Sequence, residues 1–438
     1  MLKEQLWMHD SEALWIELDQ LAEEGKDVSG LREEVEAILA MGEGTAKEEA
    51  AAAFLDKTYA LPLKKDVAYA EPSELSAIRE EAEGAKDLPA PTGEALYDKV
   101  LGAWQARCAG CLLGKPYEGA RRRQIVGILK DTNNYPPAFY TAKDAEVITR
   151  HGWQVERAWI DTVNHMPEDD DTNYTTLSLK LVDKAGRDFT PEDVAMRWLN
   201  DLPILHVCTA ERVAYRNLVA LREPPLSAMA RNPYREWIGA QIRGDFFGYI
   251  NPGRMEKAAE MAWRDASISH VKNGIYGEMM ISAMIAAAFC LDDMRAVILE
   301  GLKVIPLKSR LRQAVLDALT WPGQGLSWEQ ALDRVHSLWN EDNQHHWCHT
   351  ISNAVICVLA LLYGQKDLEK TIGIALLAGF DTDCNAATVG SVLGAMVGAK
   401  GLPQKWIAPL NDTLYTGVDG YNKVSISGMA KKTLEYLP

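Results

Sequence analysis

The sequence contains no apolar run long enough to cross a lipid bilayer. Its longest apolar stretches, residues 279–291 and 354–363, fall short of the roughly 20 residues that a membrane-spanning helix needs. We interpret both stretches as buried helices. The first ten residues also lack the apolar segment of a secretory signal peptide. We therefore expect no membrane partner.

Cysteine and positive charge are also scarce. The seven cysteines form an odd set without the regular spacing of a disulfide framework, which indicates reduced thiols and a cytoplasmic location. Lysine and arginine number 46 against 62 aspartates and glutamates, so the net charge is −16. This balance argues against nucleic acid as the main partner.

Runs of alternating hydrophobicity, which indicate half-buried strands, are absent, whereas helical spacing recurs along the chain. Apolar residues follow helical spacing over residues 14–21 and 31–39. Segments 271–290, 311–319 and 328–339 are expected to be helices as well. Hydrophobic residues make up 47% of the chain, enough to fill a sizeable core. The sequence therefore predicts an all-α protein.

Turn residues at 90–93, Ala-Pro-Thr-Gly, indicate a boundary in the chain. We predict an acidic helical extension over residues 1–92 and a second, larger domain over residues 93–438. The extension could pack on the larger domain, form a dimer contact or cover a site on it. Its Glu-rich helix faces are best explained as solvated surface.

The most informative motif is Gly-Phe-Asp-Thr-Asp-Cys-Asn at residues 379–385. Asp381 and Asp383 stand between two apolar runs, and the second run has glycine at every fourth position. A helix with such a bare face lets another backbone approach closely. Buried carboxylates are costly unless cations pair with them, which favours a divalent metal ion here.

A second acidic motif, Glu-Asp-Asp-Asp-Thr, occupies residues 168–172 and precedes a helical pattern that Gly186 ends. Its aspartates belong to a helix N-terminus, where the dipole tolerates negative charge, although three adjacent carboxylates still repel one another. Mg²⁺ or Mn²⁺ would relieve that repulsion. Either motif alone is better explained as a solvated acidic cap. Two such motifs, each opening an apolar helix, favour one shared metal centre.

Three blocks of the sequence resemble the ADP-ribosylglycohydrolase family, in the family's order. They are residues 102–118, a glycine-rich helix ending in Pro-x-Glu; residues 169–172, Asp-Asp-Asp-Thr; and residues 379–398, the Asp-x-Asp motif with its small-residue helix. The resemblance implies a single large orthogonal helical bundle with a centre of two Mg²⁺ ions, Mn²⁺ being the alternative.

By this resemblance, Asp170, Asp171, Asp381 and Asp383 ligate the metal ions, and Glu118 joins or gates the centre.

Two ligand positions differ from the family pattern. Asp169 stands where the family has threonine or serine and would add another carboxylate ligand. Cys384 stands at the last hydroxyl ligand, and thiol sulfur suits Mg²⁺ poorly. Water or the Asn385 amide could complete that shell.

The family's glycine-rich loop that holds the diphosphate of ADP-ribose is missing, and residues 243–253 take its place. Aspartate and phenylalanines there make a poor diphosphate cradle. Phe380 replaces a family glycine beside the metals, where its ring would narrow the pocket in favour of a small N-riboside. The substrate contacts that we expect are a histidine matched to the family's ribose site, the aromatics of the altered loop and two residues beside the metals: His270, Phe246, Phe247, Tyr249, Phe380 and Asn385.

The predicted activity is magnesium-dependent hydrolysis of the glycosidic bond of an ADP-ribosyl or related ribosyl conjugate by a metal-bound water. Asp170 or Asp171 is the expected base, and the spacing does not separate them. One alternative is a hydrolase of a small N-riboside or nucleoside-like substrate. Another is a metal- or ligand-binding scaffold of this family without turnover. A helical-repeat protein ranks last, because no self-similarity recurs along the chain. The oligomeric state is left open.

Two further motifs have simpler interpretations. Cys108 and Cys111 have the spacing of a zinc half-site, but no second pair follows, so we interpret them as small packing residues. The run His-His-Trp-Cys-His at residues 345–349 contains ligand types for zinc or copper. Adjacent histidines on a helix point in different directions, which makes a transition-metal site the weaker interpretation.

Overall fold

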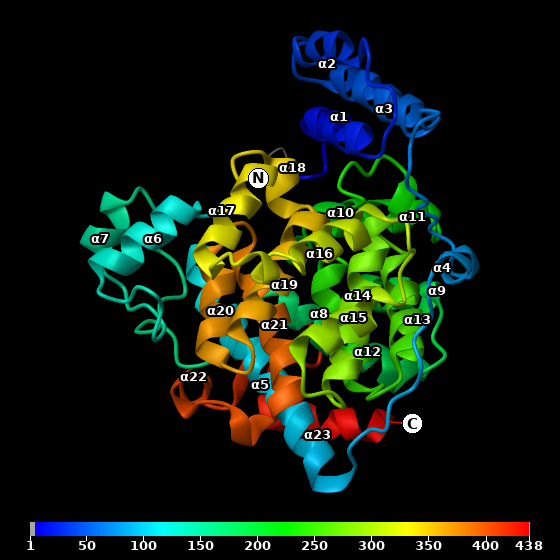
Figure 1. Cartoon of the computed structure of the whole chain (residues 1–438). Coiled ribbons are helices and arrows are strands. Elements are labelled where there is room, and N and C mark those ends of the chain that lie inside the picture. The colour runs from blue at the N-terminus through cyan, green and yellow to red at the C-terminus, as the bar shows by residue number, and fades with distance from the viewer. Residues whose placement is uncertain (1–4, 438) are drawn as a thin grey trace.

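The computed structural model describes residues 5–437 and is almost entirely helical (Figure 1). The N-terminal helices are α1 (Leu14–Glu23), α2 (Leu31–Leu39), α3 (Thr45–Tyr59) and α4 (Leu75–Glu81). The remaining helices are α5 (Gly93–Gly114), α6 (Arg122–Asp131), α7 (Ala145–Arg150), α8 (Asp170–Ala185), α9 (Pro191–Asp201), α10 (Thr209–Val219), α11 (Leu226–Met229), α12 (Asp245–Tyr249), α13 (Met255–Ala266), α14 (Asn273–Ala288), α15 (Met294–Leu302), α16 (Arg310–Ala318), α17 (Trp328–Leu338), α18 (Gln344–Cys348), α19 (Thr350–Gly364), α20 (Leu368–Leu377), α21 (Thr382–Val397), α22 (Gln404–Ile407) and α23 (Ile426–Thr433). Across residues 5–437 the single sheet is a short antiparallel pair, β1 (Thr413–Tyr415) with β2 (Lys423–Ser425). The all-α prediction is confirmed.

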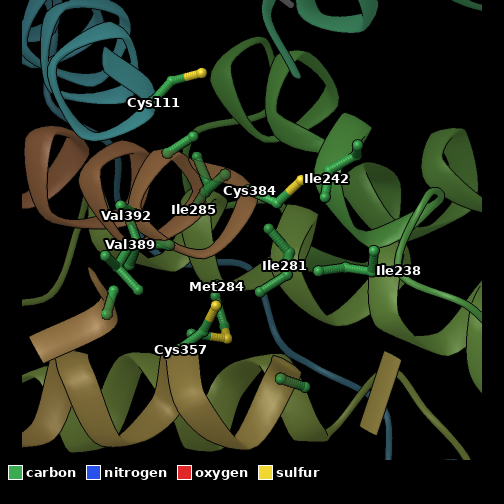
Figure 2. Packing of buried hydrophobic residues seen from close by; sticks show 14 of the residues in the cluster. Cys111, Ile238, Ile242, Ile281, Met284, Ile285, Cys357, Cys384, Val389 and Val392 are labelled. Carbon is green, nitrogen blue, oxygen red and sulfur yellow. The ribbon is translucent and has the colours of Figure 1, made fainter. Parts of the chain in front are cut away.

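Helices α14, α19 and α21 form the middle of the core. Every residue of α14 is buried, as is nearly every residue of the other two. The apolar stretches of the sequence fall in α14 and α19, as predicted. Figure 2 shows Ile281, Met284 and Cys357 from these helices in one apolar cluster. In the part of the chain that the structure describes, no helix has both the length and the apolar character needed to span a membrane.

Glycines let α5 and α21 pack with their backbones almost in contact, and Figure 1 shows the two helices side by side. A Cβ atom on Gly394 would lie 2.2 Å from the carbonyl oxygen of Gly102, and one on Gly114 would lie 2.4 Å from the Cα of Asp383. Any side chain at these positions would push the helices apart. This contact brings the C-terminal end of α5 against the first turn of α21.

Helix α8 adds the third segment of the site. It begins at Asp170 and ends before Gly186, which has a positive φ of 76°. The buried guanidinium of Arg107 on α5 holds its first turn by donating a hydrogen bond of 2.7 Å to the carbonyl oxygen of Asp171.

The segment before α5 has a small core of its own. Leu14, Val35 and Phe54, from α1, α2 and α3, belong to an apolar cluster separate from the main one. Figure 1 shows these three helices together beside the larger body of the molecule. Buried ion pairs fasten α1 to that body, since Arg235 lies 2.6 Å from Glu17. The division of the chain at residue 92 stays a prediction.

Candidate metal centre

The first acidic group lies at the N-terminus of α21. Asp381 directly precedes the helix, and Asp383 and Cys384 lie in its first turn. Donor atoms of these three side chains lie within 4.8 Å of one another, and all three residues are buried. The chain enters the helix through Gly379 and Phe380, whose φ angles are 71° and 57°. A phenylalanine in this region is strained, so its surroundings hold the backbone in place.

The second acidic group lies where α8 begins. Asp169 caps the helix, and its Oδ1 accepts a hydrogen bond of 3.0 Å from the backbone N–H of Asp171. Donor atoms of these two aspartates, of Cys111 on α5 and of Asp383 lie within 4.8 Å of one another. Asp383 therefore belongs to both groups, and the two acidic motifs of the sequence meet at its side chain.

The crowding of buried carboxylates disfavours their charged forms. Burial and the charges of Glu118 and Asp169 raise the pKa of Asp383 well above its usual value. Burial, with a contribution from Glu118, raises the pKa of Asp381 to about 7. Burial also raises the pKa of Asp170 well above its usual value, and neighbouring carboxylates add to the shift. Since a nearby cation reverses such shifts, the centre is electrostatically suited to a positive ion.

Two cations of the chain itself lie in contact with the α8 end of the centre. The Lys115 ammonium, in the turn after α5, lies 2.5 Å from Asp169 Oδ2. Burial would raise the pKa of Asp169, but the Lys115 charge, with hydrogen bonds from Lys115, the Asp171 backbone N–H and Cys111, holds that pKa below its usual value. Arg107 lies 3.4 Å from an Asp171 carboxylate oxygen and 3.0 Å from Asp245 on α12. The replacement loop of the sequence thus contributes a carboxylate that holds Arg107.

One side of the centre is open to solvent. The Glu118 side chain is 42% exposed, and its carboxylate lies 3.6 Å from Arg157. Asp170 is half-buried, and the Lys115 side chain is 22% exposed. A substrate would reach the acidic groups from this side.

Asn353 on α19 supports the entry to α21. Its Oδ1 accepts hydrogen bonds from the Asp381 backbone N–H, at 3.4 Å, and from the Asn385 amide nitrogen, at 2.8 Å. The Asn385 amide oxygen lies 3.3 Å from the thiol sulfur of Cys357. The fully buried Asn385 amide is thus engaged within the protein. Its expected contact with substrate or metal stays a prediction.

The expected substrate aromatics lie in the core. Phe247 packs on Phe189, with ring centroids 5.4 Å apart, and the Phe246 ring lies 6.3 Å from that of Tyr436. The Tyr249 ring lies 5.6 Å from that of Trp104, and its hydroxyl is hydrogen-bonded to Ser391. Phe380 packs on His336, with centroids 5.2 Å apart. All four rings are fully buried, and their contact with a substrate stays a prediction.

His270 is fully buried. Its Nδ1 lies 2.8 Å from the Ser269 hydroxyl, and its Nε2 has no hydrogen-bond partner. Burial, and then the nearby Arg243 charge, lowers the pKa of His270 well below its usual value, so the ring is neutral. Its place beside a ribose stays a prediction.

The histidine run at residues 345–349 faces a glutamate from the N-terminal segment. Nε2 atoms of His345, His346 and His349 lie 3.6, 3.4 and 3.6 Å from the Glu23 carboxylate. Each Nδ1 accepts a hydrogen bond from an N–H group, those of the Trp237 indole, the Asn340 backbone and the Ile351 backbone. A neutral imidazole that accepts at Nδ1 carries its hydrogen at Nε2. The three rings therefore turn their Nε2 atoms toward the carboxylate, and those of His345 and His349 have no hydrogen-bond partner. Glu23, His345 and His349 lie close enough to hold a metal ion, and a transition-metal site there stays the weaker interpretation.

Comparison with known proteins supports the identification of the fold. A sequence model of the ADP-ribosylglycohydrolase family matches residues 92–435. The chain belongs to this family.

A solved structure described as an "ADP-ribosylglycohydrolase-related protein complex" is similar to this family member at 17% sequence identity. The similarity covers 78% of this chain and 99% of that chain, with a TM-score of 0.45. No curated protein matches the chain. Membership in an ADP-ribosylglycohydrolase family implies a hydrolase that cleaves a glycosidic bond, and the acidic groups of this member could bind a metal ion.

Three residues of α5 and its following turn were missed as parts of the centre. Arg107, Cys111 and Lys115 are spaced four residues apart, so they follow one face of the helix among alanines and glycines. The sequence predicts Cys111 only as a packing residue, whereas its sulfur lies 3.8 Å from an Asp171 carboxylate oxygen. This row of polar side chains on an otherwise small-residue helix was the sequence signal that could have placed them in the centre.

Proposed function

We propose that this chain hydrolyses the bond at the anomeric carbon of a ribosyl conjugate, at a divalent-metal centre formed by the acidic ends of α8 and α21. The observation that carries the proposal is the position of Asp383, whose donor atoms belong to both acidic groups. Family membership supports the reaction type.

The residues present fit a divalent ion. Asp383 Oδ1 is buried and has no hydrogen-bond partner, which is costly unless a cation binds there. Carboxylate oxygens are the ligands that Mg²⁺ and Mn²⁺ prefer. A divalent ion bound by Asp381 and Asp383 would supply Lewis acidity toward the substrate hydroxyls.

Asp170 is the better candidate for the general base. Asp171 is fully buried and is paired with Arg107, so its carboxylate is already engaged. Asp170 is half-buried, and within residues 5–437 no lysine or arginine nitrogen lies within 4.0 Å of its carboxylate. In the charged form that a bound cation favours, its oxygens could accept the proton of an attacking water.

The glycosidic bond of a riboside breaks through an oxocarbenium-like state that carries positive charge. Glu118 and Asp170 place negative charge at the open side of the centre, where that state would form. Carboxylates fixed there stabilise it electrostatically without rearranging.

An ADP-ribosyl conjugate is the substrate that the family suggests, and a small N-riboside is the alternative. Helix α12 stands where the family's diphosphate loop would lie. It is buried along its length, and its Asp245 is paired with Arg107. Because α12 is buried along its length, its backbone N–H groups are not accessible to a diphosphate, which favours the small riboside. A panel of both substrate classes separates the two.

The proposal is tested by Asp383→Asn, which removes the charge shared by both groups. We expect loss of metal binding by calorimetry and loss of turnover, with helical circular dichroism unchanged. Asp188→Asn is the control, because this exposed carboxylate pairs with Lys257 at 3.5 Å, outside the centre. Full activity in Asp383→Asn would contradict the proposal. Metal binding by the wild-type chain without hydrolysis of any riboside would instead favour the alternative of a metal-binding scaffold without turnover. The cysteine at position 384, in place of a hydroxyl ligand, supports that alternative.

A further inference from the structure

The two acidic groups that share Asp383 differ in the positive charge already built around them. The group at α8 has two cations of the chain in contact with it. Lys115 lies 2.5 Å from Asp169, and Arg107 lies 3.4 Å from Asp171. Each of these carboxylates therefore has its own counter-charge.

The group at α21 has none. Within residues 5–437, no lysine or arginine nitrogen lies within 4.0 Å of Asp381 or Asp383. Asp383 is 2% exposed, and its Oδ1 has no hydrogen-bond partner. A cluster of carboxylates alone does not require a metal ion, because the α8 group is neutralised by a lysine of the chain. The unpartnered Asp383 Oδ1 is therefore the stronger sign that a cation binds here.

We propose that the centre binds one divalent ion, on Asp381, Asp383 and Cys384, and that the Lys115 ammonium replaces a second ion at the α8 group. This inference rests on the proposed metal-dependent function and departs from the expected pair of Mg²⁺ ions. A second divalent ion beside Asp169 would meet the ammonium at short range. Like charges in a buried site repel strongly, so Lys115 and a second ion exclude each other.

The third donor of the α21 group decides which ion binds. The Cys384 sulfur lies within 4.8 Å of the donor oxygens of both aspartates and is buried with them. A thiol that ligates a divalent ion does so as the thiolate, and its proton is released to solvent. Thiolate sulfur favours Zn²⁺ and Co²⁺ over Mg²⁺. The centre is therefore selective for a thiophilic ion.

Cobalt titration of the metal-free full-length chain tests both parts of the inference. We expect one Co²⁺ per chain by calorimetry and a near-ultraviolet sulfur-to-cobalt charge-transfer band. Cys384→Ser should abolish the band. Cys111→Ser is the matched control, because this buried thiol lies in the α8 group, which is assigned no ion. Two equivalents of Co²⁺, or a band lost in Cys111→Ser and kept in Cys384→Ser, would overturn the proposal.

Lys115→Met tests the role of the ammonium. Removing the charge leaves Asp169 unpaired, so we expect the stoichiometry to rise from one ion to two. Lys143→Met is the control, because Lys143 pairs with the exposed Glu156 at 3.5 Å. A folded Lys115→Met variant that still binds one ion would contradict the proposal. If the variant does not fold, the cysteine pair and the wild-type stoichiometry decide.

The same titrations separate this inference from the proposed function. One tightly bound ion in a chain that hydrolyses no riboside would support the inference and contradict the function. Two bound ions in an active enzyme would do the reverse.

Discussion

At the scale of single residues, the centre depends on where charge is left unpaired. Asp169 and Asp171 are paired with Lys115 and Arg107, whereas Asp383 has an unpartnered buried oxygen. Composition and spacing predicted that these aspartates belong to a cation site, because adjacent carboxylates at the start of a helix repel one another unless a cation binds them. They did not predict Lys115, because a lysine at the end of a helix is most often solvated, and only the α5–α21 packing turns this one inward.

Asp170 and Asp171 should behave differently when each is changed to asparagine. Asp170→Asn removes the proposed base, and we expect kcat to fall about 10²–10⁴-fold with KM little changed. Asp171→Asn takes a partner from the buried Arg107, so we expect a lower melting temperature as well as lower activity. Steady-state kinetics and thermal unfolding of both variants provide the test. Equal losses of kcat without any loss of stability would contradict the assignment.

The raised pKa of Asp381, about 7, gives the metal-free protein a defined response to pH. The folded carboxyl keeps its proton to a higher pH than the unfolded one, whose pKa is about 4. Stability from this group is therefore complete below about pH 4 and is lost as the pH rises toward 7. Divalent ions bind the charged form, so we expect metal affinity to increase over the same range.

Chemical unfolding of the metal-free chain at several pH values, with calorimetric titration beside it, measures both trends. Asp381→Asn should weaken each trend without abolishing it, because the pKa values of Asp383 and Asp170 are raised as well. Metal affinity that falls between pH 5 and pH 7 would contradict the account.

At the scale of elements, the contact of α5 with α21 positions the chemistry. The sequence predicted a bare glycine face on the second helix, and the structure confirms a close backbone approach there. The partner helix could not be identified in advance. The glycines of α5 at 102, 110 and 114, with Ala106 between the first two, also follow one helix face, but pairing two such faces requires knowledge of the tertiary fold.

Gly394→Ala tests this contact. The added Cβ would lie 2.2 Å from the Gly102 carbonyl oxygen, which belongs to backbone and cannot rotate away. We expect a loss of about 1–3 kcal/mol in the free energy of unfolding and a weaker metal site. Gly323→Ala is the control, because no atom lies within 4 Å of its added Cβ. Equal stability of the two variants, measured by denaturant unfolding, would show that the helices are not held this closely.

For the aromatic residues of α12, the sequence did not predict whether the side chains line a pocket or fill the core. Phe246, Phe247 and Tyr249 were assigned to a ligand-binding loop from their position in the family pattern. In the structure that segment is a short buried helix, and its rings pack on Phe189, Tyr436 and Trp104. One sequence cannot distinguish aromatics that line a pocket from aromatics that fill a core, because both are apolar.

At the scale of the whole molecule, buried ion pairs attach the N-terminal segment to the part of the chain that matches the family model, residues 92–435. Arg235 lies 2.6 Å from Glu17 and 2.9 Å from Glu24, both on or next to α1. Glu23 faces the three histidines at the start of α18 and α19. The sequence predicted α1 and α2 of this segment but not α3 or α4. It gave no sign of the docking, because the glutamates that bind the core look like the solvated ones.

Arg235→Met should loosen this attachment. It leaves Glu17 and Glu24 buried near each other without their shared partner, and removing one member of a buried ion pair costs about 3–5 kcal/mol. We expect faster hydrogen exchange in α1 and a lower melting temperature. Arg150→Met is the control, because Arg150 forms exposed pairs with Asp131 and Glu146, far from α1 in the chain. Unchanged exchange in α1 would mean that other contacts hold the segment.

The most direct test of the central claim is anomalous diffraction from a crystal grown with Mn²⁺ or Zn²⁺. The account predicts a peak about 2–2.5 Å from Asp383 Oδ1, with Asp381 and Cys384 around the same ion. A saturated crystal with no peak at Asp383, or with its ions held elsewhere in the molecule, would contradict the claim that the buried acidic centre at Asp383 binds a metal ion.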